Sequence, residues 1–230
     1  MNLKFHNCIK RGFDITSSLF GIMVFLPFGL LIALAIKLDS KGPVFFKQER
    51  RTKDGRVFGM LKFRTMIVNA ENIGTGLFSY DNDPRITKVG RFLRRTSLDE
   101  IPQLFNVLVG DISLVGPRPC VKYELGDYDT LNRKYKKRFD VKGGITGLAQ
   151  AKGRNENSWD EKVTLDNEYI DRFRKEGFLL DLKIIWWTII NVFASKNINE
   201  EKIDNSLSDE EAAILSDEEV KRIAHLPDPD

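Results

Sequence analysis

Residues 15–36 read ITSSLFGIMVFLPFGLLIALAI, an apolar stretch of 22 residues without a charged side chain. A helix of that length is about 33 Å long, enough to cross a hydrocarbon core of roughly 30 Å. A cleavable signal peptide is shorter and ends in small residues, whereas Lys37 and Asp39 follow this stretch. A fully buried core helix is the other alternative. We predict a membrane helix within residues 1–40, with an amphipathic lead-in.

Pro27 lies near the middle of this stretch, where it removes one backbone hydrogen bond and its ring clashes with the carbonyl of Met23. Basic residues flank the stretch on both sides, and Lys and Arg concentrate on the cytoplasmic side of membranes. They are Lys4, Lys10 and Arg11 before it, and Lys37, Lys41, Lys47, Arg50, Arg51 and Lys53 after it. A kinked spanning helix is one interpretation. We favour a re-entrant helix that enters, breaks at Pro27 and returns.

The net charge of +3 hides an asymmetry along the chain. Residues 197–230 contain eleven Asp and Glu against three Lys and Arg, a net of −8, so the preceding residues carry about +11. A basic body suits nucleic acid, a phospholipid surface or a phosphorylated substrate. Because a membrane segment has no role in binding nucleic acid, we predict no nucleic-acid partner. Cys8 and Cys120 lack the spacing of a disulfide framework or zinc site, which indicates a reducing compartment.

The rest of the chain predicts an α+β fold that is mostly helical and contains one small β-hairpin. Two β-type runs, residues 43–48 and 57–66, are joined by the turn sequence KDG at 53–55. Residues 177–193 (GFLLDLKIIWWTIINVF) predict an interfacial helix, with a core helix as the alternative. We divide the chain into a membrane part (1–40), a main domain (41–196) and an acidic tail (197–230). The tail repeats SDEE, which favours two short helices.

The densest group of charges lies in residues 83–108, where five cations precede the adjacent acids Asp99 and Glu100. The cations are Arg85, Lys88, Arg91, Arg94 and Arg95. A capping box formed by Ser97 and Glu100 is the structural alternative. Pro102 is better placed as the first residue of a helix, which leaves both acids just outside the helix entrance, where anions bind.

These residue types suit chemistry at phosphorus. An ionised aspartate can attack phosphorus and form an acyl phosphate, and nearby arginines are expected to hold its pKa low. Attack on a diphosphate needs its charge neutralised by Arg, Lys and Mg²⁺, a hard ion that carboxylate and phosphate oxygens bind.

Other polar residues are weaker candidates. Arg118 lies between two prolines, which would pre-organise it for a phosphate, and Lys62 and Arg64 alternate with apolar residues as on a half-buried strand. Asp81 and Asp83 form an Asp-x-Asp pattern that suggests a metal-dependent glycosyltransferase. The pattern recurs at 127–129 and 228–230, so it is unspecific.

Taken together, these segments resemble the monotopic phosphoglycosyl transferases, the bacterial sugar transferase family of small PglC-like enzymes. The matching runs are KRGFD (10–14), GPVFFKQER (42–50), KFRTM (62–66), DPRIT (83–87), TSLDEIPQL (96–104), GDISLVGPRP (110–119), GITGLAQ (144–150), GRN (153–155) and LLDLK (179–183). They follow the family's order over about residues 8–190.

The resemblance implies a Mg²⁺-dependent ping-pong reaction at the cytoplasmic face of the bacterial inner membrane. Asp99 would attack the β-phosphate of a UDP-sugar, release UMP and hold the phosphosugar until polyprenyl (undecaprenyl) phosphate accepts it. Glu100 would assist as metal ligand or proton handler, so both acids are candidate catalytic residues and metal ligands. The candidate substrate-binding residues are Lys62, Arg64, Arg94, Arg118, Arg154 and Asp181.

The sequence departs from the family pattern where Leu26 replaces a frequent serine before Pro27, and where Leu148 and Lys152 replace other frequent residues. These departures leave the sugar open. Membrane lipids and other glycan-assembly enzymes are further candidate partners. Two other function classes stay open: a metal-dependent glycosyltransferase that releases UDP, and a non-catalytic adaptor whose basic body binds anionic lipid.

Overall fold

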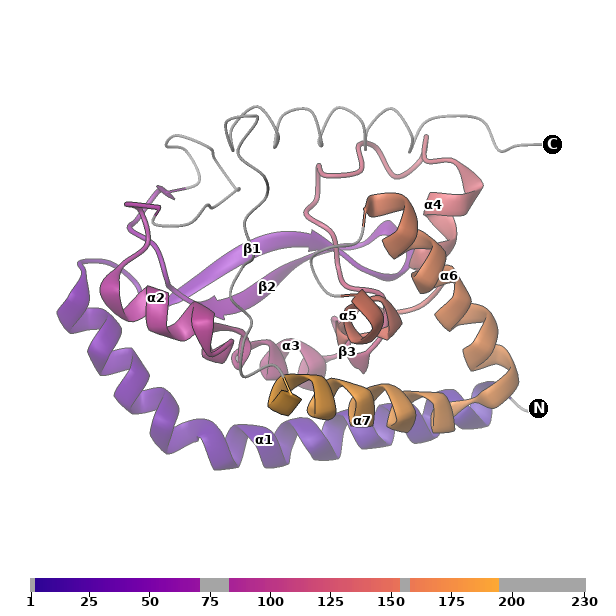
Figure 1. Cartoon of the computed structure of the whole chain (residues 1–230), viewed down its shortest axis with the longest axis horizontal. Helices are drawn as coiled ribbons and strands as arrows, with labels where there is room; N and C mark the ends of the chain where they lie inside the picture. The colour runs from indigo at the N-terminus through magenta and orange to yellow at the C-terminus, as the bar shows by residue number, and fades with distance from the viewer. Residues whose placement is uncertain (1–2, 71–82, 154–157, 195–230) are drawn as a thin grey trace.

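The computed structural model describes residues 3–70, 83–153 and 158–194. Helices dominate it and four strands form two small sheets, so the α+β prediction is confirmed (Figure 1). The elements are α1 (Leu3–Asp39), β1 (Phe45–Arg51), η1 (Lys53–Gly55), β2 (Val57–Phe63), α2 (Lys88–Arg95), η3 (Leu98–Glu100), α3 (Gln103–Val109), β3 (Ser113–Val115), α4 (Arg133–Lys137), η4 (Arg138–Asp140), β4 (Gly144–Thr146), α5 (Leu148–Gly153), α6 (Trp159–Glu176) and α7 (Phe178–Ala194). The predicted acidic tail lies outside the described residues, and the three-part division stays a prediction.

The predicted hairpin is present. Strands β1 and β2 pair antiparallel, and η1 turns the chain between them with positive φ angles of 56° at Asp54 and 73° at Gly55. Asp and Gly tolerate this left-handed backbone, which explains why the KDG sequence forms the turn. The second strand ends at Phe63 rather than at Met66, because Met66 pairs with Ile86 instead.

A second, parallel pair of strands joins the two halves of the body. Ser113 of β3 lies opposite Gly144 of β4, and Val115 lies opposite Thr146. The backbones approach so closely that a Cβ on Gly144 would meet the amide nitrogen of Gly116 at 2.1 Å. The helices α5, α6 and α7 cover this pair with buried apolar side chains, and burial of such side chains is the main favourable contribution to folding. The cluster is Val115, Leu148, Tyr169, Ile170, Phe173, Leu180 and Ile184.

Helix α1 runs along one edge of the molecule and is bent (Figure 1). It contains Pro27 and continues through it, so the helix bends without being interrupted. An interior proline is the usual cause of a sharp bend. Within the described residues, α1 is the one helix long and apolar enough to cross a membrane by length and composition. Large apolar side chains are exposed along it, including Phe20, Met23, Leu30, Leu31 and Leu34.

The N-terminal half of α1 is fixed to the body by charged side chains. Lys10 Nζ lies 2.5 Å from Asp181 Oδ2 of α7, and Arg11 donates to the carbonyls of Val107 and Leu108 at 2.7 and 2.8 Å. A basic side chain on the last carbonyls of a helix is a common C-terminal cap, here of α3. The buried Asp14 of α1 accepts hydrogen bonds from the hydroxyl of Ser113 and the amide of Leu114 at 2.8 and 3.0 Å.

The C-terminal end of α1 contacts the same body. Ile36 is buried against Phe63 and Leu93. Arg64 donates to the carbonyls of Ser40 and Lys41 at 2.7 and 2.8 Å, just beyond the last turn of the helix. Both ends of α1 are therefore held by one folded unit.

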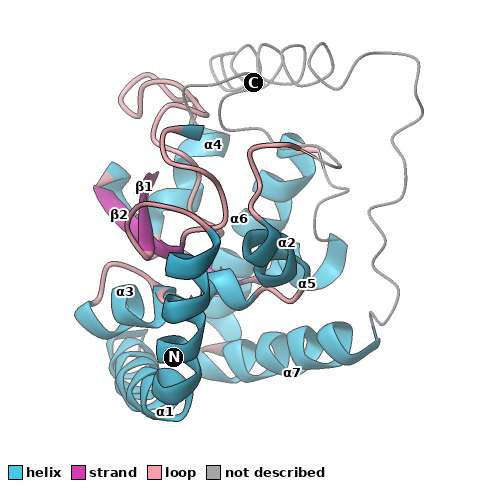
Figure 2. Cartoon of the chain, turned by 90° about the vertical axis from the view of Figure 1, so that its left-hand side faces the viewer, coloured by secondary structure: helices cyan, strands magenta, loops and turns pink. Residues whose placement is uncertain are grey.

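Helix α7 has two different faces. Leu180 and Ile184 are buried in the core, whereas Leu179, Trp186 and Ile190 are exposed. Helices α1 and α7 lie along the same side of the molecule in both views (Figures 1 and 2). The core-helix alternative for residues 177–193 thus holds for one face, whereas the other face exposes apolar side chains, and the interfacial helix stays a prediction.

Candidate active site

A cleft of about 460 Å³ opens beside the hairpin. Its polar lining includes Lys62, Arg94, Asp99 and Glu100, and Phe45 and other apolar side chains complete its wall. Strand β2, the end of α2 and the turn η3 therefore bring together four residues that the sequence predicted to act together.

The two carboxylates lie in η3, between α2 and α3. Ser97 has a positive φ of 56° and its side chain caps no helix end, so the capping-box alternative is wrong. Pro102 immediately precedes α3, which keeps Asp99 and Glu100 outside that helix, as predicted. The strained turn at Ser97 directs the chain so that both carboxylates reach the cleft.

Glu100 is held by two cations from distant parts of the chain. Its Oε1 accepts from Lys62 Nζ at 2.9 Å and from Arg118 Nη2 at 2.5 Å. Burial alone would raise the pKa of Glu100, but Arg118 and Lys62 outweigh it and hold the pKa well below its usual range. Glu100 therefore stays ionised throughout the physiological range.

Asp99 differs from its neighbour. It is 9 % exposed, and burial raises the pKa of its carboxyl above the ordinary value. The negative charge of Glu100 raises this pKa further, whereas the positive charge of Lys62 lowers it. The expectation that nearby arginines hold this pKa low is wrong, because the cost of removing the charge from water exceeds their attraction. In the described part of the chain, Asp99 forms no ion pair with a Lys or Arg.

The cations around the carboxylates come from three places. Burial lowers the pKa of the Lys62 ammonium despite Glu100, while Glu100 raises the pKa of the Arg118 guanidinium. Arg94 donates from Nε to Thr65 Oγ1 at 3.0 Å and lines the same cleft. The site is thus a pair of acids surrounded by cations, which suits a multiply charged anion.

Arg50 also lines the cleft, although it was not among the candidate substrate-binding residues predicted from the sequence. Gln48 and Arg50 follow Phe46 at intervals of two on β1, and Phe46 lies opposite Lys62 of β2. The period-two alternation of a strand could have placed them on the Lys62 face.

The remaining candidate residues lie elsewhere or have another partner. Arg64 lines the cleft, but its guanidinium binds the carbonyls beyond α1. Asp181 does not line the cleft; it accepts from Lys10 and, at 2.8 Å, from the Tyr169 hydroxyl. Arg154 lies outside the described residues.

Among the described residues, no three His, Cys, Asp or Glu side chains are grouped as a metal site. Mg²⁺ often uses only one or two carboxylates and takes its other oxygens from water and substrate phosphates. Asp99 and Glu100 fit that requirement, since Glu100 Oε2 has only a long contact of 3.4 Å to Arg118.

The alternative metal site at Asp81 and Asp83 has less support. Asp83 is fully buried, and Arg85 binds both of its oxygens, at 2.9 Å to Oδ1 and 2.6 Å to Oδ2. Arg85 also donates to the carbonyl of Ala70 at 3.0 Å, so this pair fixes the chain beside the cleft. Asp81 lies outside the described residues.

The fold and site define a class of protein in which two carboxylates surrounded by cations lie on a folded body that also carries a long, exposed apolar helix. The chain belongs to the bacterial sugar transferase family, whose model matches residues 5–195.

Three relatives illustrate the similarity. The chain is 42% identical to the uncharacterized sugar transferase EpsL of Bacillus subtilis, over 84% of this chain and 91% of the relative. It is 42% identical to the undecaprenyl-phosphate glucose phosphotransferase of Komagataeibacter xylinus, over 82% of this chain and 36% of the relative. It is 45% identical to the UDP-glucose:undecaprenyl-phosphate glucose-1-phosphate transferase of Klebsiella pneumoniae, over 82% of this chain and 41% of the relative. The chain therefore spans well under half the length of the two glucose transferases.

Proposed function

We propose that this chain moves a sugar-1-phosphate from a UDP-sugar to a polyprenyl phosphate such as undecaprenyl phosphate. The buried carboxylate of Asp99, on the wall of the cleft beside the Lys62–Glu100–Arg118 cluster, is the observation that carries the proposal. The names of the relatives from Komagataeibacter xylinus and Klebsiella pneumoniae support the acceptor, and the latter name supports the donor. Such a reaction belongs to the first membrane step of glycan or polysaccharide assembly.

In the first half-reaction, an oxygen of Asp99 attacks the β-phosphorus of the UDP-sugar. A new bond joins that oxygen to phosphorus, and the bond from phosphorus to the bridging oxygen breaks, so UMP leaves with that oxygen. The cations Lys62, Arg94 and Arg118 lower the repulsion between the carboxylate and the diphosphate. The raised pKa of Asp99 makes its carboxylate more basic than an ordinary aspartate, which favours attack.

In the second half-reaction, a phosphate oxygen of the polyprenyl phosphate attacks the same phosphorus. The bond from phosphorus to Asp99 breaks, the carboxylate returns, and the product is a polyprenyl diphosphosugar. Because Arg118 and Lys62 keep Glu100 ionised, we assign Glu100 to orienting these cations rather than to handling protons. Bound Mg²⁺, held by Asp99 and Glu100, would neutralise charge on the diphosphate.

We further propose that α1 is re-entrant in the inner membrane and that the catalytic domain faces the cytoplasm. One folded body holds both ends of the helix, through Lys10 and Arg11 near its start and through Ile36 and Arg64 at its end. A straight crossing would separate these ends by the roughly 30 Å of the hydrocarbon core. The exposed apolar face of α7 lies on the same side and would rest at the interface.

The reaction is tested by the nucleotide released. Incubation of the chain with a panel of UDP-sugars, polyprenyl phosphate and Mg²⁺ is expected to yield UMP and polyprenyl diphosphosugar for at least one sugar. Release of UDP would favour the metal-dependent glycosyltransferase. Lipid binding that fades with salt, without any nucleotide turnover, would favour the adaptor.

The topology makes a separate prediction. In a Cys8→Ser background, which removes the one exposed native thiol among the described residues, Phe5→Cys and Phe45→Cys should both resist an impermeant maleimide in intact cells. Both should react after the membrane is permeabilised. Labelling of either position in intact cells would place that end outside and would support a spanning helix instead.

A further inference from the structure

Arg118, which forms an ion pair with Glu100, lies in a segment that is neither helix nor strand. Because Pro117 and Pro119 have no amide hydrogen, the backbone around Arg118 is short of donors. Its carbonyls provide the anchoring instead, and four in a row accept a hydrogen bond. The pairs are Gly144 N to Pro117 O at 2.9 Å, Arg138 Nη2 to Arg118 O at 2.7 Å, Arg50 Nη1 to Pro119 O at 2.7 Å, and Arg51 N to Cys120 O at 2.9 Å.

The donor on Arg118 itself is unusual, because Arg138 is a buried guanidinium. It is 3 % exposed and forms an ion pair of 2.9 Å with Asp166 of α6, which is 2 % exposed. Its guanidinium lies 5.1 Å from the Trp159 ring centroid and 5.6 Å from that of Phe139. Burying two charges is costly, and here one of them also donates to a backbone carbonyl beside the site, a contact that an apolar side chain could not make.

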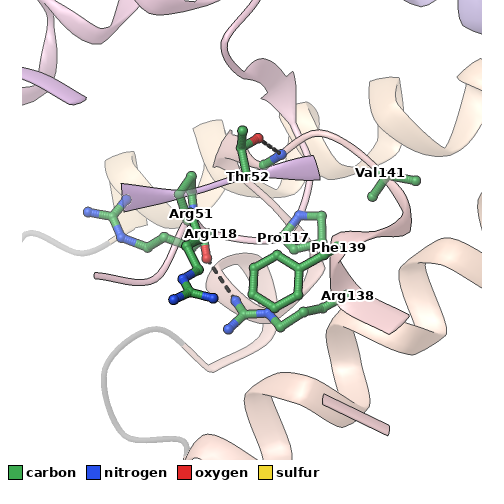
Figure 3. Close-up of a pocket in the computed structure, with 9 residues that line it drawn as sticks. Arg51, Thr52, Pro117, Arg118, Arg138, Phe139 and Val141 are labelled. Atoms are coloured by element: carbon green, nitrogen blue, oxygen red, sulfur yellow. Dashed lines mark hydrogen bonds between the residues drawn. The ribbon is translucent and has the colours of Figure 1, made fainter. Parts of the chain in front are cut away.

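Figure 3 shows the geometry. The Arg138 guanidinium points to the carbonyl of Arg118 across a small pocket of about 10 Å³, which Thr52 and Phe139 also line. Neither arginine lines the large cleft; Arg118 reaches the site through its ion pair with Glu100, and Arg138 reaches it only through the Arg118 carbonyl.

We propose that Arg138, held by Asp166, is a positioning residue for Arg118. Its hydrogen bond to the Arg118 carbonyl sets the position from which the Arg118 guanidinium binds Glu100 and the substrate phosphates. The expected effect on catalysis rests on the proposed function, whereas the statement that Arg138 positions Arg118 rests on the contacts alone. Arg50 braces the next carbonyl, but it lines the cleft itself, so its loss would not separate positioning from direct binding.

The test is a double-mutant cycle between positions 138 and 118. Arg138→Lys keeps the charge opposite Asp166, but the lysine side chain ends one bond short of Nη2, the nitrogen that contacts both the Asp166 carboxylate and the Arg118 carbonyl. It is expected to lower kcat/KM for the UDP-sugar by about 10- to 100-fold, in the same kinetic parameter that Arg118→Ala lowers. The double variant should be no worse than Arg118→Ala alone, because Arg138 acts through Arg118.

Lys137→Gln is the matched control, since it neutralises the neighbouring cation, whose pair with Asp171 is partly exposed, and should keep wild-type kinetics. If Arg138→Lys does not fold, the pair Arg138→Gln and Asp166→Asn replaces it in the cycle, because that pair leaves no unmatched buried charge. Losses that multiply in the double variant, or wild-type kinetics in the folded Arg138 variant, would overturn the proposal.

Hydrogen exchange keeps this inference separate from the proposed function. Arg138→Lys should speed exchange at the amides of Gly144 and Arg51, which donate to the carbonyls of Pro117 and Cys120, by about tenfold or more, whether or not the chain turns over a UDP-sugar. If the wild-type chain releases no UMP, the proposed function is wrong, and this exchange measurement still tests whether Arg138 positions Arg118. Unchanged exchange at both amides would remove the positional claim itself.

Discussion

Asp99→Asn is expected to lower sugar-phosphate transfer by about 10³-fold or more without lowering the thermal stability of the chain. The amide has the shape of the carboxyl but cannot attack phosphorus. UMP release with UDP-sugar, polyprenyl phosphate and Mg²⁺ measures the first effect, and thermal unfolding in detergent measures the second.

The expectation that Asp99→Asn does not lower thermal stability follows from the direction in which the pKa of Asp99 is shifted. Burial raises the pKa of Asp99, so its folded-state pKa lies above the unfolded value and the ionised form is disfavoured in the folded chain. The protonated carboxyl therefore contributes stability at low pH, and that contribution is lost as the pH rises through the folded pKa. At neutral pH the neutral amide avoids this cost, so the unfolding temperature should stay level or rise.

Asp83→Asn is the matched control for stability. Asp83 is also buried, but its pKa is lowered, chiefly by its hydrogen bonds with Arg85. The same change of carboxylate to amide should therefore destabilise the chain at position 83 and not at position 99. Undiminished transfer in Asp99→Asn, or a fall in its unfolding temperature like that of Asp83→Asn, would contradict this assignment of roles.

Asp181→Ala is expected to destabilise the chain by about 3 kcal/mol. Asp181 is 1 % exposed and binds both Lys10 of α1 and the Tyr169 hydroxyl of α6, so its loss leaves a partly buried ammonium without its counter-charge. The first half of α1 should then separate from α7 more readily. Thermal or denaturant unfolding in detergent measures the change.

Asp171→Ala provides the comparison, because its bridge to Lys137 is partly exposed and should contribute less than about 1 kcal/mol. The family resemblance instead suggests that Asp181 binds substrate. A raised KM with unchanged stability in Asp181→Ala would support that role and contradict the structural one.

Local sequence patterns carried much of the fold. The KDG turn requires residues that accept positive φ, and the flanking runs have the alternation of strands, so the hairpin could be predicted from one short segment. Pro102 likewise indicates the start of a helix, because its ring fixes φ and removes the amide hydrogen, and this placed Asp99 outside the helix.

Long-range partners could not be predicted in the same way. Lys10 and Asp181 are 171 residues apart, and only the packing of α1 against α7 joins them. Local sequence places Arg118 between two prolines, but neither Arg138 nor its contact with the Arg118 carbonyl is visible in that motif.

The pKa of Asp99 shows why charge counts near a residue are insufficient. Several arginines precede it in the sequence, which suggested a low pKa, yet burial is the dominant effect and raises it. Glu100, the next residue, shows the opposite result because Lys62 and Arg118 contact it directly. Burial and contact depend on tertiary structure, so adjacent carboxyls with the same local sequence differ in the direction of their shifts.

The most direct measurement is mass spectrometry of the chain after acid quenching during turnover of a UDP-sugar with Mg²⁺ and no acceptor. A phosphosugar should be found on the carboxyl of Asp99, should disappear when polyprenyl phosphate is added, and should not form in Asp99→Asn. Formation of UMP without any adduct at position 99, or an adduct that persists in Asp99→Asn, would show that another group attacks phosphorus.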